Sequence, residues 1–169
     1  MTRAAYDYDV PLSVLYAVGL TETGNRGMLG PYDINVDGRS IPFGSLEQAL
    51  ERVAIEQARG AKFIDIGCMQ INQRWHAQKF RSLREMFDPV ANVRYAARFL
   101  RELKSREGNW TLAVARYNAG PDNDPAQKKY VCAVIRNMVA SRLGRWTESA
   151  RAFCGGRSEA AVSGASDAP

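Results

Sequence analysis

The sequence contains only one histidine, His76, and three cysteines, Cys68, Cys132 and Cys154, among its 169 residues. A single histidine cannot supply the clustered imidazole ligands of an ordinary zinc enzyme, and the cysteine spacing matches neither a zinc motif nor a redox motif. A Ser-His-Asp triad would depend on His76 alone, and we expect this residue to lie on the surface of a helix. The sequence therefore predicts no metal ion and no other cofactor.

Long apolar segments are also missing from the chain. No stretch approaches the ~20 apolar residues that a helix needs to cross a bilayer, so no membrane span is expected. The apolar run over 10–20 follows Asp7 and Asp9 instead of a basic leader, and it continues into polar residues at 21–23. This pattern predicts a helix of a folded domain rather than the core of a signal peptide.

Long basic runs are missing too, although the formal net charge is +5 and the isoelectric point is near 9.3. This surplus suits a polyanionic partner such as nucleic acid, an anionic membrane surface or the bacterial cell wall. The basic residues are scattered, and Lys128-Lys129 is the longest uninterrupted run. Because this pattern lacks the basic arm of a nucleic-acid tail, we do not expect nucleic acid as a partner.

The first half of the chain predicts helices interrupted by one pair of short strands. Asp9 and Pro11 open a first helix, which ends at Glu22. Asp37-Gly38 is a strong signal for a tight turn between extended pieces at 34–36 and 40–41. Ser45 with Gln48 then caps an amphipathic helix that stops at position 60. We therefore expect one small β-hairpin between two helices.

The second half of the chain predicts only helices and a tail. Helices are expected over 73–80, 89–108, 112–119, 125–144 and 147–154, with caps or openings at Ser82, Asp88, Thr111, Asp124 and Thr147. Residues 155–169 are mostly small or polar and show no periodicity, so they cannot bury enough surface to fold. The sequence therefore predicts one mainly helical α+β domain over residues 1–154, followed by a disordered tail over 155–169.

Glu22 occupies an unusual position for a charged residue. It lies seven residues after Leu15 and four after Val18, so helical spacing places its carboxylate in line with the apolar stripe. Burial there, beside the negative end of the helix dipole, disfavours the ionised form and raises the pKa, as a general acid working near neutrality requires. A carboxylate at a helix end is more often solvated or paired with a base such as Arg26, so this feature alone does not establish catalysis.

Four sequence blocks together resemble a known family. They are the segment over 10–24 with Glu22-Thr23, Gly67-Cys68-Met69-Gln70-Ile71-Asn72, Phe87-Asp88-Pro89 with Asn92, and the segment over 113–120 with Tyr117-Asn118-Ala119-Gly120, followed by Tyr130-Val131. In this order and spacing, the chain resembles the catalytic domain of the soluble lytic transglycosylases, in the lysozyme-like superfamily, from about Val10 to Tyr130. Thr23 replaces the family's serine and Cys68 its leucine. The long insertion between Glu22 and Gly67 resembles the branch attached to secretion or flagellar machinery.

The resemblance implies a lysozyme-like fold in which Glu22 is the single catalytic acid and base. Glu22 would protonate the glycosidic oxygen between MurNAc and GlcNAc and then take a proton from the MurNAc hydroxymethyl group, which closes an anhydro ring. The N-acetyl group of MurNAc would stabilise the oxocarbenium-like centre in place of a second carboxylate. Asp65 is the nearest candidate for such a carboxylate, and we expect a structural role for it.

The matching blocks also supply candidate substrate-binding residues, which are Thr23, Met69, Gln70, Tyr117, Asn118 and Tyr130. The methionine would offer an adaptable apolar surface in the cleft, and the glutamine would hydrogen-bond the sugar acetamide in both directions. The two tyrosines would offer ring faces to sugar and hydroxyl groups to the Glu22 carboxyl, and the asparagine would position a backbone or sugar group. Outside the blocks, core packing would explain the buried members equally well, most of all Met69.

Two other functions fit the same residues. A hydrolase similar to goose-type lysozyme would keep the fold but let water attack instead of the sugar's own hydroxyl. A non-catalytic wall-binding or assembly module would keep the cleft as a recognition surface, although the intact Glu22 argues against it. The expected partners are peptidoglycan glycan strands and a secretion or flagellar assembly. The expected protein is an exported periplasmic monomer whose leader is absent from this chain.

The spacing of the cysteines around Gly144 predicts a disulfide. The short connection at Gly144-Arg145 makes the last two helices neighbours running in opposite directions. Cys132 lies twelve residues before Gly144 and Cys154 ten after it, so their sulfur atoms fall at similar heights. We expect a bond between Cys132 and Cys154 and a buried thiol at Cys68, with Cys68 to Cys154 as the rival pairing.

Overall fold

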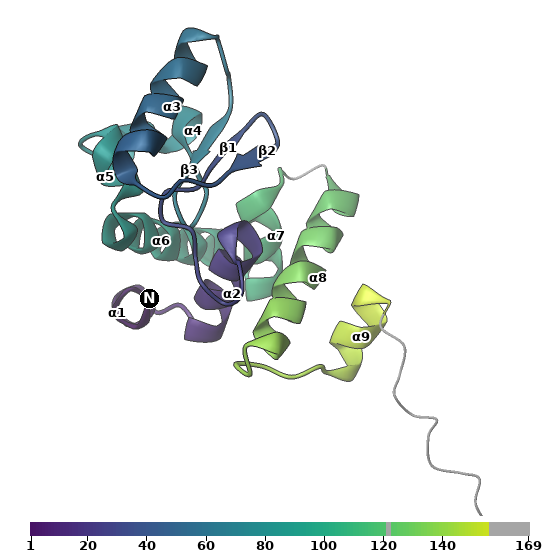
Figure 1. Ribbon diagram of the computed structural model, residues 1–169. Helices are drawn as coiled ribbons and strands as arrows, with labels where there is room; N and C mark the ends of the chain where they lie inside the picture. The colour runs from purple at the N-terminus through teal and green to yellow at the C-terminus, as the bar shows by residue number, and fades with distance from the viewer. Residues whose placement is uncertain (121–122, 156–169) are drawn as a thin grey trace, which may run out of the picture.

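The computed structural model describes residues 1–120 and 123–155. Its helices are α1 (Thr2–Asp7), α2 (Leu12–Thr23), α3 (Leu46–Ala58), α4 (Gln73–His76), α5 (Leu83–Phe87), α6 (Pro89–Glu107), α7 (Trp110–Asn118), α8 (Asp124–Ala140) and α9 (Glu148–Cys154), with a 3-10 turn, η1, at Ala77–Lys79. Its strands are β1 (Ile34–Val36), β2 (Arg39–Ile41), β3 (Ile64–Ile66) and β4 (Ile71–Asn72). Figure 1 shows the strands and α3 on one side of the molecule and α2, α6, α7 and α8 on the other. The mainly helical α+β fold expected from the sequence is confirmed.

The strands form one antiparallel sheet in the order β2-β1-β3-β4. β1 pairs with β2 across the expected turn, where Gly38 has a φ of +89° that favours glycine. The sheet is larger than the expected hairpin, because β3 pairs with β1 and β4 pairs with β3. These two added strands contain three and two residues, too few for alternation to show in the sequence. Their register places Asp65 opposite Asn72.

The helices begin at small polar capping residues, as the sequence indicated. The side chains of Ser45, Ser82, Asp88 and Thr147 each accept a hydrogen bond from a backbone N–H three residues further along. The expectation that Thr111 caps α7 is wrong, because the helix begins at Trp110 and its cap is Asn109, which accepts from the N–H of Leu112. Asn123 caps α8. The short helix α1 was not expected from the sequence.

Packing between α2 and α8, between α6 and α7, and between α7 and α8 builds the helical part of the core. Leu15 and Val18 of α2 are fully buried there, as are Ala96 and Ala97 of α6 and Ala113 of α7. Alanines at the contacts allow the helix axes to approach closely. The end of α2, which carries Glu22, is thereby fixed against α8.

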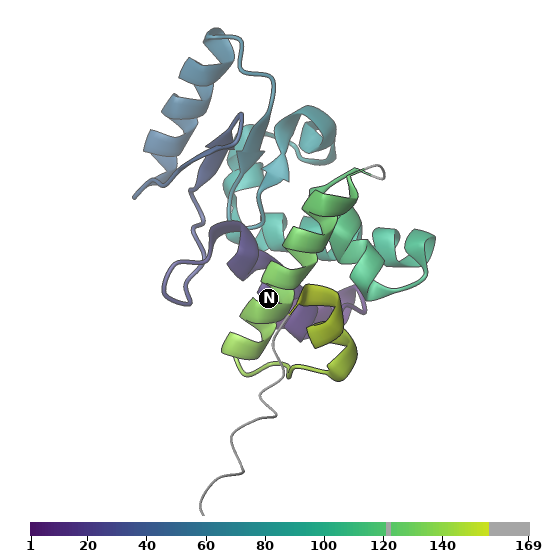
Figure 2. The same cartoon turned by 90° about the vertical axis from the view of Figure 1, so that its right-hand side faces the viewer.

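A disulfide joins Cys132 on α8 to Cys154 at the end of α9, the pair that the predicted helix hairpin suggested. Figure 2 shows α9 lying beside α8, with the connection between them at one end. Cys68 is buried and free, so the rival pairing with Cys154 is wrong. The predicted tail falls outside the described residues from position 156 onward.

Candidate active site

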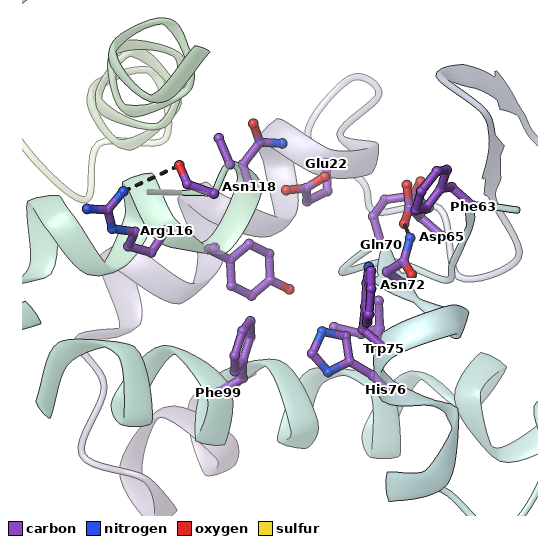
Figure 3. A pocket seen from close by; sticks show the side chains of 14 residues that line it. Glu22, Phe63, Asp65, Gln70, Asn72, Trp75, His76, Phe99, Arg116 and Asn118 are labelled. Carbon is purple, nitrogen blue, oxygen red and sulfur yellow. Dashed lines mark hydrogen bonds between the residues drawn. The ribbon is translucent and has the colours of Figure 1, made fainter. Parts of the chain in front are cut away.

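A cleft of about 370 Å³ lies between the sheet side and the helical side of the molecule. Figure 3 shows Glu22 beside Asn118, with Asp65, Gln70 and Asn72 on one side of the cavity and Phe99 and His76 across it. The lining residues are Glu22, Phe63, Asp65, Gln70, Ile71, Asn72, Trp75, His76, Phe99, Arg116, Tyr117, Asn118, Ala119 and Gly120. They come from segments far apart in the sequence, so only the folded chain forms this cleft.

Glu22 lies in the last turn of α2, where packing buries most of its side chain. The hydroxyl of Tyr130 on α8 donates a hydrogen bond to Oε1 of Glu22. Burial raises the pKa of Glu22 from 4.5 to about 7; the Tyr130 bond opposes this shift, and the negative charge of Asp65 adds to it. A carboxyl group with this pKa exists in both protonation states near neutrality, as a group that donates and accepts a proton must.

Tyr130 reaches the site only through its hydroxyl group. Its side chain is 8% exposed and is not among the residues that line the cleft. The ring face that was expected to meet sugar is therefore buried between helices, because α8 packs against α2 at this point. Burial, together with the negative charge of Glu22, raises the pKa of the Tyr130 phenol well above its usual range, so the hydroxyl remains a donor.

Asp65 is a second carboxylate in the cleft. The antiparallel register of β3 and β4 places it opposite Asn72, whose Nδ2 donates a hydrogen bond to Oδ1 of Asp65 at 2.6 Å. Burial raises the pKa of Asp65, and this hydrogen bond opposes the shift. Asp65 therefore has the local hydrogen bond expected of a structural residue and also faces the same cavity as Glu22.

The loop between β3 and β4 is held in place by Asn92, a fully buried residue of α6. Its Oδ1 accepts a hydrogen bond from the backbone N–H of Met69 at 2.9 Å, and its Nδ2 donates to the carbonyls of Ile66 at 2.9 Å and Met86 at 2.8 Å. A Cβ atom on Gly67, which has a φ of +76°, would lie 2.9 Å from Nδ2 of Asn92. The loop can approach α6 this closely only because Gly67 has no side chain.

Gln70 turns from this loop into the cleft. Its backbone is left-handed, with a φ of +48°, and its Nε2 donates to the carbonyls of Gly67 at 2.9 Å and Asp33 at 3.2 Å. Both of these bonds use the amide nitrogen, so the amide oxygen is the group that a bound ligand can use. Gln70 lines the cleft as expected, but as an oriented acceptor rather than a two-way group.

Tyr117 and Asn118 end α7 and line the opposite wall of the cleft. The hydroxyl of Tyr117 donates a hydrogen bond to the carbonyl of Met69 at 2.8 Å, and its ring lies 5.8 Å from that of Phe99 between centroids. Burial, and then the negative charge of Glu22, raises the pKa of the Tyr117 phenol well above its usual range. Tyr117 thus connects α7 to the β3–β4 loop and closes the base of the cleft.

Thr23 and Met69 do not line the cleft, although both were expected to bind substrate. The hydroxyl of Thr23 donates to the carbonyl of Cys68 at 2.9 Å and accepts from the N–H of Gly30 at 3.2 Å. These two bonds turn the Thr23 side chain toward the β3–β4 loop, whereas the neighbouring Glu22 lines the cleft. Met69 is fully buried and contributes only its carbonyl group, which holds Tyr117.

His76 lies on α4 and is partly exposed, as expected, and its ring forms part of the cleft wall. Its Nδ1 is 2.7 Å from the hydroxyl of Tyr95, and its ring lies 5.0 Å from that of Phe99 between centroids. Burial lowers the pKa of His76 from 6.5, which favours the neutral imidazole. Nδ1 is engaged with the Tyr95 hydroxyl, so Nε2 is the ring nitrogen that a bound ligand can use.

Phe63 and Trp75 are the exposed aromatic residues of the site, with 44% and 59% of their surfaces accessible. Neither was identified from the sequence, although Trp75 lies three residues after Asn72, the end of the second motif block. Aromatic residues close after a motif block are a sequence signal for a sugar-binding site, because exposed ring faces bind the apolar faces of sugars. Phe99 and Arg116 were missed as well, because they occupy ordinary helical positions in the sequence.

The polar groups of the cleft suit acid and base chemistry. A carboxyl group that titrates near neutrality faces a second carboxyl, amide groups and aromatic rings. Over residues 1–120 and 123–155, no three His, Cys, Asp or Glu side chains gather as a metal site would require. In the same ranges, every helix is too short or too polar to cross a bilayer.

One comparison with known proteins identifies a family. The family model described as the transglycosylase SLT domain matches residues 1–139, which include Glu22, Asp65, Tyr117 and Tyr130. No curated protein and no solved structure matches the chain. The match covers most of the sequence and all of the residues that line the cleft.

Proposed function

The chain belongs to the transglycosylase SLT domain family, and from this membership and the geometry of the cleft we propose that it cleaves peptidoglycan as a lytic transglycosylase. The family indicates the class of reaction and the substrate. The observation that supports the residue assignment is the carboxyl group of Glu22, which lies in the cleft, accepts a hydrogen bond from Tyr130 and has a pKa of about 7. We assign both proton transfers of the reaction to Glu22.

The first transfer is from Glu22 to the substrate. With Oε1 held by Tyr130, the proton of the neutral carboxyl group is carried by Oε2 and is given to the glycosidic oxygen between MurNAc and GlcNAc. The bond from C1 of MurNAc to that oxygen breaks, and GlcNAc leaves with a free hydroxyl group. The carbonyl oxygen of the MurNAc N-acetyl group bonds to C1 and takes up the positive charge that develops there.

The second transfer returns a proton to Glu22. The carboxylate accepts the proton of the MurNAc C6 hydroxyl, whose oxygen bonds to C1 while the N-acetyl oxygen leaves. The product is 1,6-anhydro-MurNAc, no water is consumed, and Glu22 ends in the protonated state in which it began. A pKa near 7 suits this cycle, because neither state of the carboxyl is strongly favoured near neutrality.

The walls of the cleft would hold the sugars on either side of the broken bond. Phe63 and Trp75 offer exposed ring faces, and the amide oxygen of Gln70 offers an acceptor for a sugar N–H or O–H group. The side-chain amide of Asn118 and Nε2 of His76 offer further hydrogen-bonding groups from the cleft walls.

Asp65 favours a second candidate function, a hydrolase in which two carboxyl groups act on one sugar. It lies in the same cavity as Glu22, and its charge affects the Glu22 pKa. In the transglycosylase, Asp65 would stabilise the positive charge at C1 without forming a bond to it; in a hydrolase, it would activate water or form the bond itself. A non-catalytic wall-binding module remains the third candidate.

Mass spectrometry of digested peptidoglycan separates these functions. Purified sacculi incubated with the full chain should release muropeptides that are lighter by one water than the same muropeptides released by a hydrolase. Products of hydrolytic mass would instead establish the two-carboxylate enzyme, and absence of release would leave the wall-binding module. Because peptidoglycan lies outside the cytoplasmic membrane, we place this activity in the periplasm, where recruitment by a secretion or flagellar assembly is the proposed context.

A further inference from the structure

Arg74 lies between two aromatic rings at the edge of the cleft. Its guanidinium carbon is 5.5 Å from the ring centroid of Phe63 and 5.2 Å from that of Trp75. Both rings line the cavity, one from the segment before β3 and the other from α4. Arg74 therefore holds a positive charge at the rim, beside the rings that would contact the glycan.

This positive charge has no carboxylate partner in the part of the chain that the structure describes. No Asp or Glu oxygen within those ranges lies within 4.0 Å of the Arg74 guanidinium. Arg116, which lines the cleft, is paired with Glu107 at 3.4 Å, and Arg84, which lies outside the cleft, is paired with Glu47 at 3.5 Å. Contact with two ring faces orients the planar guanidinium group, and its N–H donors remain available at its edge.

Backbone hydrogen bonds and helix packing hold Phe63 and Trp75 in position. The N–H of Phe63 donates to Oδ1 of Asp37 at 3.3 Å, and the carbonyl of Phe63 accepts from the N–H of Asp37 at 3.0 Å. Trp75 belongs to α4, which packs against β3. The guanidinium group is therefore held in one region of the rim, and less conformational entropy is lost when an anion binds it.

We propose that Arg74, held between Phe63 and Trp75, binds a carboxylate group of the peptide stem on the glycan strand. This inference rests on the proposed function. Each stem leaves the strand from the lactyl group of MurNAc, so sugars inside the cleft place stems at its rim. The stem contributes the anionic groups of this substrate, and a fork of N–H donors matches the two oxygens of a carboxylate. Arg74 would thus favour strands that still carry charged stems.

The test compares glycan strands with native stems and strands whose stem carboxylates have been converted to amides. Amidation removes the negative charge and keeps the size of the stem. We expect wild-type kcat/KM to be about three- to tenfold higher on native strands, and Arg74→Gln to bring the ratio close to one. Arg74→Lys should keep part of the preference, because it retains the charge and loses the planar fork. Arg84→Gln removes one exposed charge outside the cleft and should keep the wild-type ratio.

Each result decides the role of Arg74. If Arg74→Gln lowers kcat/KM equally on both substrates, the arginine only supports the rings. If Arg74→Gln keeps the wild-type kcat/KM on both substrates, the arginine has no part in stem recognition. Co-sedimentation with native and amidated strands, in the Glu22→Gln background, measures the same preference without cleavage. If the wild type cleaves neither substrate, the proposed function fails, while the binding ratio still tests Arg74.

Discussion

The hydroxyl of Tyr130 donates a hydrogen bond to Oε1 of Glu22, a residue 108 positions away in the sequence. Packing of α2 against α8 brings these two side chains together. The bond favours the ionised carboxylate, whereas burial favours the neutral acid and has the larger effect, so the Glu22 pKa settles at about 7. Tyr130 therefore sets the pH range in which Glu22 can act as an acid.

Replacing Tyr130 by Phe should move the alkaline limit of activity to higher pH. In the wild type, kcat/KM should fall about tenfold per pH unit above about pH 7, because the acid must be protonated. Loss of the hydroxyl removes a bond to the ionised form, which raises the Glu22 pKa further. The pH profile of glycan cleavage measures this shift. Tyr16→Phe, which removes a hydroxyl bonded to the Gly27 carbonyl, is the control and should leave the profile in place. A shift to lower pH would contradict the role given to Tyr130.

Replacing Glu22 by Gln should stabilise the fold at alkaline pH. Because the folded-state pKa of about 7 lies above the ordinary 4.5, the folded protein binds this proton more tightly than the unfolded chain. Ionised Glu22 therefore costs stability, by at most about 3 kcal/mol above pH 7, and this cost disappears below pH 4.5. Urea unfolding should show a gain for Glu22→Gln at about pH 8 and none at about pH 4. A variant less stable than wild type at both pH values would mean that Glu22 is not held in a desolvated position.

Much of the fold could be predicted because capping residues and periodicity indicate long helices directly. Asp88 and Pro89 mark the start of α6, and Ser45 marks that of α3, within one residue of the observed bounds. The sequence could not reveal α1 or the two added strands, because these elements are short and form through contacts with distant segments. The pairing of Cys132 with Cys154 followed from helix lengths around Gly144, which are local properties.

The site was only partly predictable, because motif membership does not say which way a side chain points. Gln70 and Met69 are neighbours, yet the left-handed backbone of Gln70 turns it into the cleft while Met69 fills the core. Trp75 and His76 belong to the site because α4 packs against β3, a contact that the sequence pattern does not contain. Glu22 could be singled out because a charge on an apolar stripe is visible in the sequence itself.

Replacing Asn92 by Ala should destabilise the protein by about 2–4 kcal/mol. The substitution removes three buried hydrogen bonds, to the carbonyls of Ile66 and Met86 and from the N–H of Met69. Equilibrium unfolding in urea measures the loss, and Asn35→Ala is a control in which the lost side-chain bonds are exposed. A loss below about 1 kcal/mol would show that the β3–β4 loop does not depend on Asn92.

Reducing the disulfide should lower stability and leave the cleft chemistry intact. Cys132 and Cys154 close a loop with a sequence separation of 22, which contributes about 3 kcal/mol in the chain-entropy model. The double variant Cys132→Ser, Cys154→Ser should show the same loss in urea unfolding and should cleave glycan at the wild-type rate while folded.

Burial raises the pKa of the Cys68 thiol to about 11, so a thiol reagent should label it only on unfolding. Rapid labelling of Cys68 in the native protein would contradict its buried position.

The central claim, that Glu22 alone carries the proton in both steps, is tested most directly by the cleavage rates of Glu22→Gln and Asp65→Asn on the same glycan strands. Glutamine keeps the shape of the side chain and its bond to Tyr130 but cannot transfer a proton, so kcat/KM should fall by about two to four orders of magnitude. Asp65→Asn should cost less than about tenfold, because the N-acetyl group of the substrate takes the place of a second carboxylate. Near-wild-type cleavage by Glu22→Gln, or an equal and near-total loss in both folded variants, would contradict the single-carboxylate account.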